Sequence, residues 1–160
     1  MKDIQFLGNK ELLNLHKTAF LASSTIHPDK VLKCYDWATA KHDGCVVSGF
    51  SSKLEQDVLH FLMKSNVPII MVLARQMYKQ MPQELQTLFD ENRLLVISVS
   101  NAVRQSKTTA LARNKYICEI ADYWKEYYVM NYHQSWQEVR QQRCQAPQSE
   151  RLLESNCQQP

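Results

Sequence analysis

Glycine is scarce in this chain of 160 residues, which contains only Gly8, Gly44 and Gly49. Phosphate-binding loops of the dinucleotide-fold and P-loop types need several closely spaced glycines, because their backbone must approach the phosphate and turn sharply. Three separated glycines exclude both motifs. A phosphate would have to be bound by helix N-termini, hydroxyl groups and arginines instead.

Long apolar runs and a cysteine framework are also missing. No run of 18 apolar residues occurs, and the first residues, MKDIQFLGNKELL, lack the apolar segment and cleavage site of a signal peptide. The five cysteines are odd in number and widely spaced, which favours reduced thiols over disulfides. A net charge of +3 permits an anionic ligand without demanding one. We expect a cytoplasmic protein that does not contact a membrane.

Four short apolar segments have the composition of buried strands. They cover residues 18–22, 45–48, 68–74 and 94–98. Segments of helical periodicity lie between and after them, and strands that alternate with helices predict parallel pairing through right-handed crossovers. We therefore expect an α/β fold, a three-layer Rossmann-like domain with a doubly wound, mostly parallel sheet of about five strands and helices on both faces.

Helix boundaries can be placed from capping signals. The pattern predicts a helix from Pro28 to the turn at Asp43-Gly44, others over 82–92 and 107–123, and one opened by the Ser52 to Glu55 capping box. Ser106 is the expected N-cap of the 107–123 helix. A fifth strand is predicted at 127–132 and a short helix at Ser135. We expect one domain over 1–143 and a disordered, glutamine-rich tail over 144–160.

Ligands of open parallel sheets bind beyond the carboxyl ends of the strands, and the residues at those positions are polar here. The candidate ligand-binding or phosphate-binding residues are Ser23, Ser24, Ser48, Gly49, Phe50, Ser51, Ser52, Arg75, Arg113 and Asn114. Gly49 would allow close approach, and the helix that begins at Ser52 would direct free N–H groups at an anion. Arg75 and Arg113 would add charge-assisted hydrogen bonds.

The sharper form of this hypothesis is that five side chains line one pocket. They are Ser48, Ser51, Arg75, Arg113 and Asn114. The alternative is that the serines are only helix caps and turns, since helix starts favour serine everywhere, and that each arginine forms a surface ion pair.

Metal and catalytic chemistry are not indicated. The five histidines show no paired spacing, and His42 with Cys45 is two ligands short of a structural zinc site. Cys45 begins an apolar strand and is expected to pack in the core. The capping role of Glu55 explains the only acid beside the proposed pocket. We predict no metal, no cofactor and no catalytic residue. Core packing or a dimer interface is the more common role of aromatic residues such as those near Trp136, and stacking on the bases of single-stranded nucleic acid is the alternative.

Several short segments match a known family in order and spacing. They are Leu7-Gly8-Asn9, Lys17-Thr18-Ala19-Phe20-Leu21, the run from Cys45 to Ser52, Pro68-Ile69-Ile70, Leu73-Ala74-Arg75, Arg93-Leu94-Leu95, and Arg104 with Ser106, Thr109, Ala110, Arg113 and Asn114. Over residues 6–122 the chain resembles the short, single-domain relatives of DNA-processing protein A (DprA/Smf), in the SLOG group of Rossmann-like domains. The resemblance implies a non-catalytic domain that binds a nucleotide-type ligand or single-stranded DNA during DNA processing or uptake, as a homodimer or higher homo-oligomer.

The chain also departs from that family. Its usual His-Ser appears here as Ser51-Ser52, Gln76 replaces the glycine after Arg75, and aromatic residues replace a late glycine-bearing loop. Two alternatives stay open. The related Lonely Guy group hydrolyses nucleoside monophosphates, but its proline-glycine-glycine motif is absent here. A scaffold that has lost its ligand would retain the fold alone.

Overall fold

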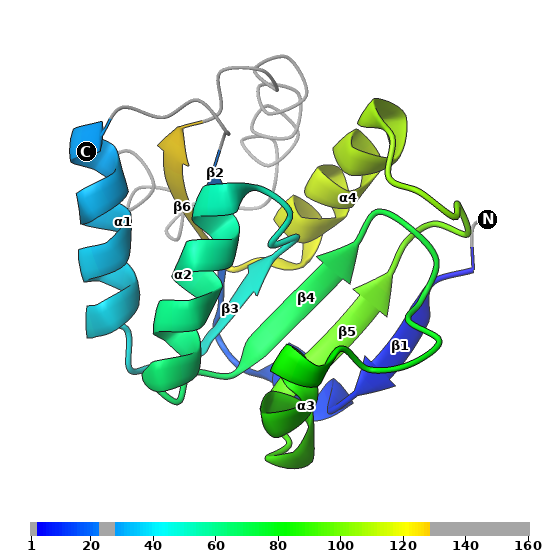
Figure 1. The fold of residues 1–160 in the computed structure, drawn as a ribbon, viewed down its shortest axis with the longest axis horizontal. Helices are drawn as coiled ribbons and strands as arrows, with labels where there is room; N and C mark the ends of the chain where they lie inside the picture. The colour runs from blue at the N-terminus through cyan, green and yellow to red at the C-terminus, as the bar shows by residue number, and fades with distance from the viewer. Residues whose placement is uncertain (1–2, 23–27, 129–160) are drawn as a thin grey trace, which may run out of the picture.

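A computed structural model describes residues 3–22 and 28–128. The strands of this part of the chain are β1 (Gln5–Gly8), β2 (Lys17–Ala22), β3 (Cys45–Ser48), β4 (Ile69–Leu73), β5 (Leu94–Ser98) and β6 (Tyr123–Tyr128). The helices are α1 (Pro28–Ala40), α2 (Lys53–Lys64), α3 (Gln83–Asp90) and α4 (Lys107–Ile120), with a 3-10 helix η1 (Lys10–Asn14) after β1. Figure 1 shows their arrangement.

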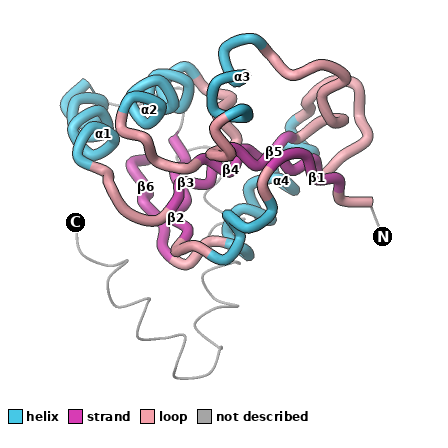
Figure 2. Tube along the Cα trace, turned by 90° about the horizontal axis from the view of Figure 1, so that it is seen from below, coloured by secondary structure: helices cyan, strands magenta, loops and turns pink. Residues whose placement is uncertain are grey.

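The sheet has the order β1-β5-β4-β3-β2-β6 among the described residues. Successive crossovers place β2, β3, β4 and β5 side by side and parallel, and the chain then passes through α4 to β6, which pairs in parallel with the opposite edge of β2. Helices α1, α2 and α3 cover one face and α4 covers the other (Figure 2). The three-layer Rossmann-like α/β fold is confirmed.

The core lies in two layers, one on each face of the sheet. Strands β3, β4 and β5 are buried along their whole length, because helices cover both faces. Val46 and Ile69 face the layer beneath α1, α2 and α3, whereas Val47 and Ile70 face the layer that contains Ile117 of α4. In the described ranges, no helix is long and apolar enough to cross a membrane.

Capping residues in the sequence predicted the starts of α1, α2 and α4 correctly. The capping box of Ser52 and Glu55 is present at the start of α2, and Ser106 caps α4 as expected. Helix α1 begins at Pro28 but ends at Ala40, before the predicted turn. Helix α3 is shorter than the predicted 82–92 segment, because Pro82 is its N-cap and Glu91 its C-cap.

The two edges of the sheet differ from the prediction. Strand β1, which was not anticipated, pairs antiparallel with β5, so the sheet has one strand more than the expected five or so. Strand β6 begins at Tyr123 rather than at residue 127, and α4 ends at Ile120 rather than at residue 123. The rest of the predicted strand, the helix at Ser135 and the 144–160 tail lie outside the described residues.

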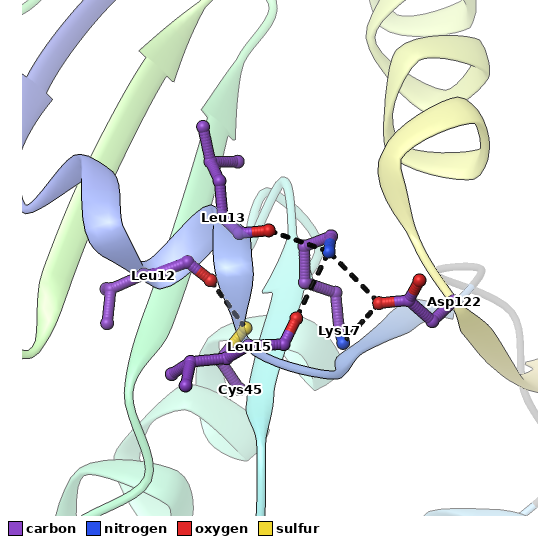
Figure 3. A network of polar contacts seen from close by, with 6 residues as sticks. All are labelled: Leu12, Leu13, Leu15, Lys17, Cys45 and Asp122. Carbon is purple, nitrogen blue, oxygen red and sulfur yellow. Dashed lines mark hydrogen bonds and ion pairs between the residues drawn. The ribbon is translucent and has the colours of Figure 1, made fainter.

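A polar network between Lys17 and Asp122 explains why α4 ends at Ile120. The backbone N–H of Lys17 donates to the Asp122 carboxylate over 2.9 Å, and the N–H of Asp122 donates to the Lys17 carbonyl over 2.8 Å. The Lys17 ammonium lies 3.0 Å from the same carboxylate and donates to the carbonyls of Leu13 and Leu15 (Figure 3). These bonds hold Asp122 beside β2, so the next residue starts a strand.

Candidate functional site

A pocket of about 360 Å³ lies at the carboxyl ends of β3 and β4. Gly49, Phe50 and Ser51 reach it from the turn between β3 and α2, and Arg75 reaches it from the end of β4. Arg113 of α4 completes this part of the lining. Its volume is at the lower end of the range of small-ligand sites, and its position is the one expected of ligand sites in parallel sheets.

Behind the pocket, Glu55 is buried to 3% exposure and held by two serines. The Ser48 hydroxyl donates to Oε2 of Glu55 over 2.9 Å, and the Ser52 backbone N–H donates to Oε1 over 3.3 Å. The Ser48 hydroxyl oxygen also accepts from the N–H of Phe50. Burial raises the pKa of Glu55, although the positive charge of Arg113 and the serine hydrogen bonds act against the rise. The N-terminus of α2 therefore binds a carboxylate from its own helix, that of Glu55.

Arg113 is the buried cation of the pocket, with only 3% of its surface exposed. One terminal nitrogen donates to the Ser51 hydroxyl over 3.1 Å and to the Gln105 side-chain carbonyl over 3.0 Å. Its Nε donates to the side-chain oxygen of Asn114 over 3.1 Å. A guanidinium cannot lose its proton at physiological pH, so α4 holds a permanent positive charge at the pocket wall.

Gly49 is the residue that makes room for this guanidinium. A Cβ atom built on Gly49 would lie 2.7 Å from Cζ and Nε of Arg113, closer than real Cβ contacts. The next residue, Phe50, has a φ of 47°, a left-handed conformation that is rare for a bulky side chain. Together, the glycine and the left-handed Phe50 fix the path of the turn beside the guanidinium.

Arg75 presents a second, exposed cation at the pocket. Its guanidinium lies 5.1 Å from the centre of the Tyr78 ring, which also lines the pocket. The Arg75 carbonyl accepts from the Ser98 hydroxyl over 2.7 Å, so the end of β4 is tied to the end of β5. The pocket thus combines the exposed cation of Arg75, the ring of Tyr78 and the buried cation of Arg113.

The structure brings half of the predicted residues to this pocket. Gly49, Phe50, Ser51, Arg75 and Arg113 line it. The other described ones stand behind it, where Ser48 and Ser52 bond Glu55 and Asn114 bonds Arg113. Ser23 and Ser24 lie outside the described residues.

Two N–H groups at the α2 N-terminus are bonded within the helix itself. The N–H of Ser52 donates to the Glu55 carboxylate, and the N–H of Glu55 donates to the Ser52 hydroxyl. The capping box therefore uses two of the donors that were expected to point at an anion. Arg113 and Arg75 bring positive charge to the pocket.

Sequence reasoning missed several lining residues, among them Gln105, Tyr78, Glu84 and His60. Gln105 directly precedes the N-cap of α4, and Tyr78 follows Arg75 by three residues, so proximity to predicted site residues was the available signal. Glu84 and His60 lie on helix faces with no such signal. Among the described residues, no group of three His, Cys, Asp or Glu side chains could hold a metal ion.

Comparisons with known proteins agree on the fold. No family model matches the sequence, and no curated protein matches it. The structure is similar to DNA processing protein A (DprA) from Streptococcus pneumoniae, with a TM-score of 0.61 and 18% identity, over 76% of this chain and 44% of that one. It is also similar to DNA processing protein A from Helicobacter pylori, described for its unique single-stranded DNA binding mode, with a TM-score of 0.67 and 19% identity, over 99% of this chain and 83% of that one.

These comparisons show that the chain has a DprA-like fold. It spans less than half the length of the Streptococcus pneumoniae protein. The resemblance inferred from the segments between residues 6 and 122 is therefore supported by structures found independently of it.

Proposed function

We propose that this chain is a DprA-like domain that binds single-stranded DNA or a nucleotide-type ligand, without catalysis, through the pocket at the carboxyl ends of β3 and β4. The observation that carries the proposal is the convergence of Arg113, Arg75 and the Tyr78 ring on one pocket. Arg113 of α4 donates to Ser51, Gln105 and Asn114 and lies close enough to Glu55 to act on its pKa, so its guanidinium is held in place at the pocket wall.

The three groups have complementary roles toward a nucleotide. The exposed guanidinium of Arg75 would contact a phosphate oxygen through charge-assisted bonds, and the buried guanidinium of Arg113 would add its positive charge from behind Ser51. The ring of Tyr78 would stack on a base, an interaction that every base can make. The Ser51 hydroxyl, which already faces Arg113, would be a further donor to phosphate. The similarity in fold to a protein that binds single-stranded DNA supports this assignment.

The test is binding of a fluorescein-labelled dT oligomer to the purified chain, measured by fluorescence anisotropy at 50 and 200 mM salt. Affinity should fall as salt rises, because phosphate contacts release counterions. The Arg75→Ala variant should bind more weakly and show a salt slope smaller by roughly 0.7 for the lost phosphate contact. Arg75 is exposed, so the substitution leaves the fold intact.

A matched control removes one positive charge from the far end of α2. Lys64 is exposed, lies in the last turn of that helix and does not line the pocket. The Lys64→Ala variant should bind like the wild type. Equal losses in the two variants would mean that binding follows net charge and not this pocket, and would overturn the proposal.

A panel of nucleoside mono-, di- and triphosphates distinguishes the two ligand classes. Competition by free nucleotides for the oligomer site would indicate a small-ligand pocket that also accepts DNA. A cytoplasmic role in DNA processing or uptake and a homo-oligomeric state extend the same proposal, together with the single domain over 1–143. Light scattering coupled to size exclusion, with and without the oligomer, measures the oligomeric state directly.

A further inference from the structure

The pocket has equal numbers of arginines and carboxylates in and directly behind its lining. Two arginines, Arg75 and Arg113, face it, and Glu84 of α3 lines it with a carboxylate. The second carboxylate, Glu55, is buried behind Ser48 and Ser52, close enough for Arg113 to act on its pKa. The formal charges of these four side chains therefore cancel, although the pocket presents its arginines toward the ligand.

The hydrogen bonds around Glu55, together with the positive charge of Arg113, favour its ionised form. Both of its carboxylate oxygens accept, one from the Ser52 N–H and one from the Ser48 hydroxyl. The Ser48 hydroxyl itself accepts from the N–H of Phe50, which leaves its own proton for Glu55.

We propose that Glu55, with Glu84 at the rim, makes the pocket selective for a phosphate that carries one negative charge, as a phosphodiester does, over a terminal phosphate. This inference rests on the proposed function. A phosphate monoester carries nearly two negative charges above pH 7, since its second proton leaves near pH 6. A phosphodiester adds one negative charge to a site whose formal charges already cancel, whereas a monoester dianion adds two, so the two carboxylates oppose the dianion more strongly.

The desolvation of Glu55 strengthens this effect. Charges act on one another more strongly across a buried, low-dielectric region than across water, so the buried carboxylate opposes a dianion more than a surface carboxylate would. The capping box adds to it, because the Ser52 N–H that would favour an anion at the start of α2 is bound to Glu55. Glu55 thus acts through charge and need not touch the ligand.

The experiment compares two ligands that differ by one charge and one methyl group. They are thymidine 5′-monophosphate and its methyl ester, titrated into the whole chain by calorimetry at pH 7.5. The wild type should bind the methyl ester more tightly. The Glu55→Gln variant, whose amide has nearly the same shape, should gain roughly five- to tenfold in affinity for the monophosphate relative to the ester.

Two further variants make the result decisive. Asp57→Asn removes the same charge from α2 at a residue that pairs with Lys53 and Tyr35 and does not line the pocket, so the ratio of affinities should stay at the wild-type value. Glu84→Gln changes an exposed residue, cannot disturb the core, and should shift the ratio in the same direction by a smaller factor. It tests the charge balance even when Glu55→Gln does not fold.

The outcomes separate this inference from the function on which it rests. Binding of both ligands with the same ratio in wild type, Glu55→Gln and Glu84→Gln would overturn charge selection and leave the proposed function standing. Failure of wild type and variants to bind either nucleotide or the dT oligomer would overturn both. An equal shift of the affinity ratio in Asp57→Asn and Glu55→Gln would also overturn charge selection by Glu55, because any acidic residue of α2 would then suffice.

Discussion

Replacing Gly49 by alanine should damage the pocket through one side chain, Arg113. The added Cβ would lie 2.7 Å from Cζ and Nε of Arg113 and 2.8 Å from a terminal nitrogen, so the guanidinium has to move. A flexible side chain would move at little cost on the surface. Arg113 is 3% exposed and bonded to Ser51, Gln105 and Asn114, so it cannot move without breaking some of these bonds.

The size of the effect follows from those bonds. A hydrogen bond with a charged donor contributes roughly 1.5 to 3 kcal/mol, and the terminal nitrogen makes two of them, to Ser51 and Gln105. Partial relaxation should keep some of this energy. We expect Gly49→Ala to lower the free energy of unfolding by about 2 to 4 kcal/mol, measured by urea denaturation, and to abolish most binding of the dT oligomer.

A double-mutant cycle isolates the cause. In an Arg113→Ala background the guanidinium is gone, so the same Gly49→Ala change should cost less than about 1 kcal/mol. Equal costs in both backgrounds would show that the added methyl group clashes with something other than Arg113, or strains the backbone. That result would refute the view that Gly49 is present to accommodate the guanidinium.

Three further predictions concern titratable groups. Burial raises the pKa of Glu55, so its contribution to stability is complete below the unfolded value of 4.5 and is lost as pH rises through the folded value. Glu55→Gln should therefore gain stability relative to wild type from pH 4.5 upward in a series of urea titrations. Burial also acts to raise the pKa of Asp122, but bonds from the backbone N–H and ammonium of Lys17 outweigh it and lower the pKa. The stabilisation by Asp122 is present above 3.8 and lost as pH falls, so Asp122→Asn should show a smaller loss of stability on acidification than wild type, followed by circular dichroism. Burial raises the pKa of Cys45 to about 11, so iodoacetamide at pH 8 should leave Cys45 unmodified in native protein and alkylate it in urea, as read by mass spectrometry. Rapid labelling of native Cys45 would contradict its place in the core.

Local signals in the sequence determined much of this fold. Strands β3 and β5 occur at the predicted residues, because short apolar runs bounded by turn residues leave few alternatives. The starts of α2 and α4 were equally clear, since a serine and the residue three positions later satisfy each other's backbone groups within one turn. The doubly wound topology followed from the alternation of these elements and from the handedness of crossovers.

Contacts between distant residues decided the rest. The start of β6 depends on bonds between Lys17 and Asp122, 105 positions apart, and no local pattern near Tyr123 encodes them. The pocket depends likewise on Arg113 reaching Ser51 across 62 positions and on the fit of its guanidinium over Gly49. The sequence by itself determined which polar residues follow the strands. Only the tertiary structure decided which of them face the pocket and which, like Ser48 and Ser52, bind a buried carboxylate, because that choice depends on how α2 and α4 pack at the sheet end.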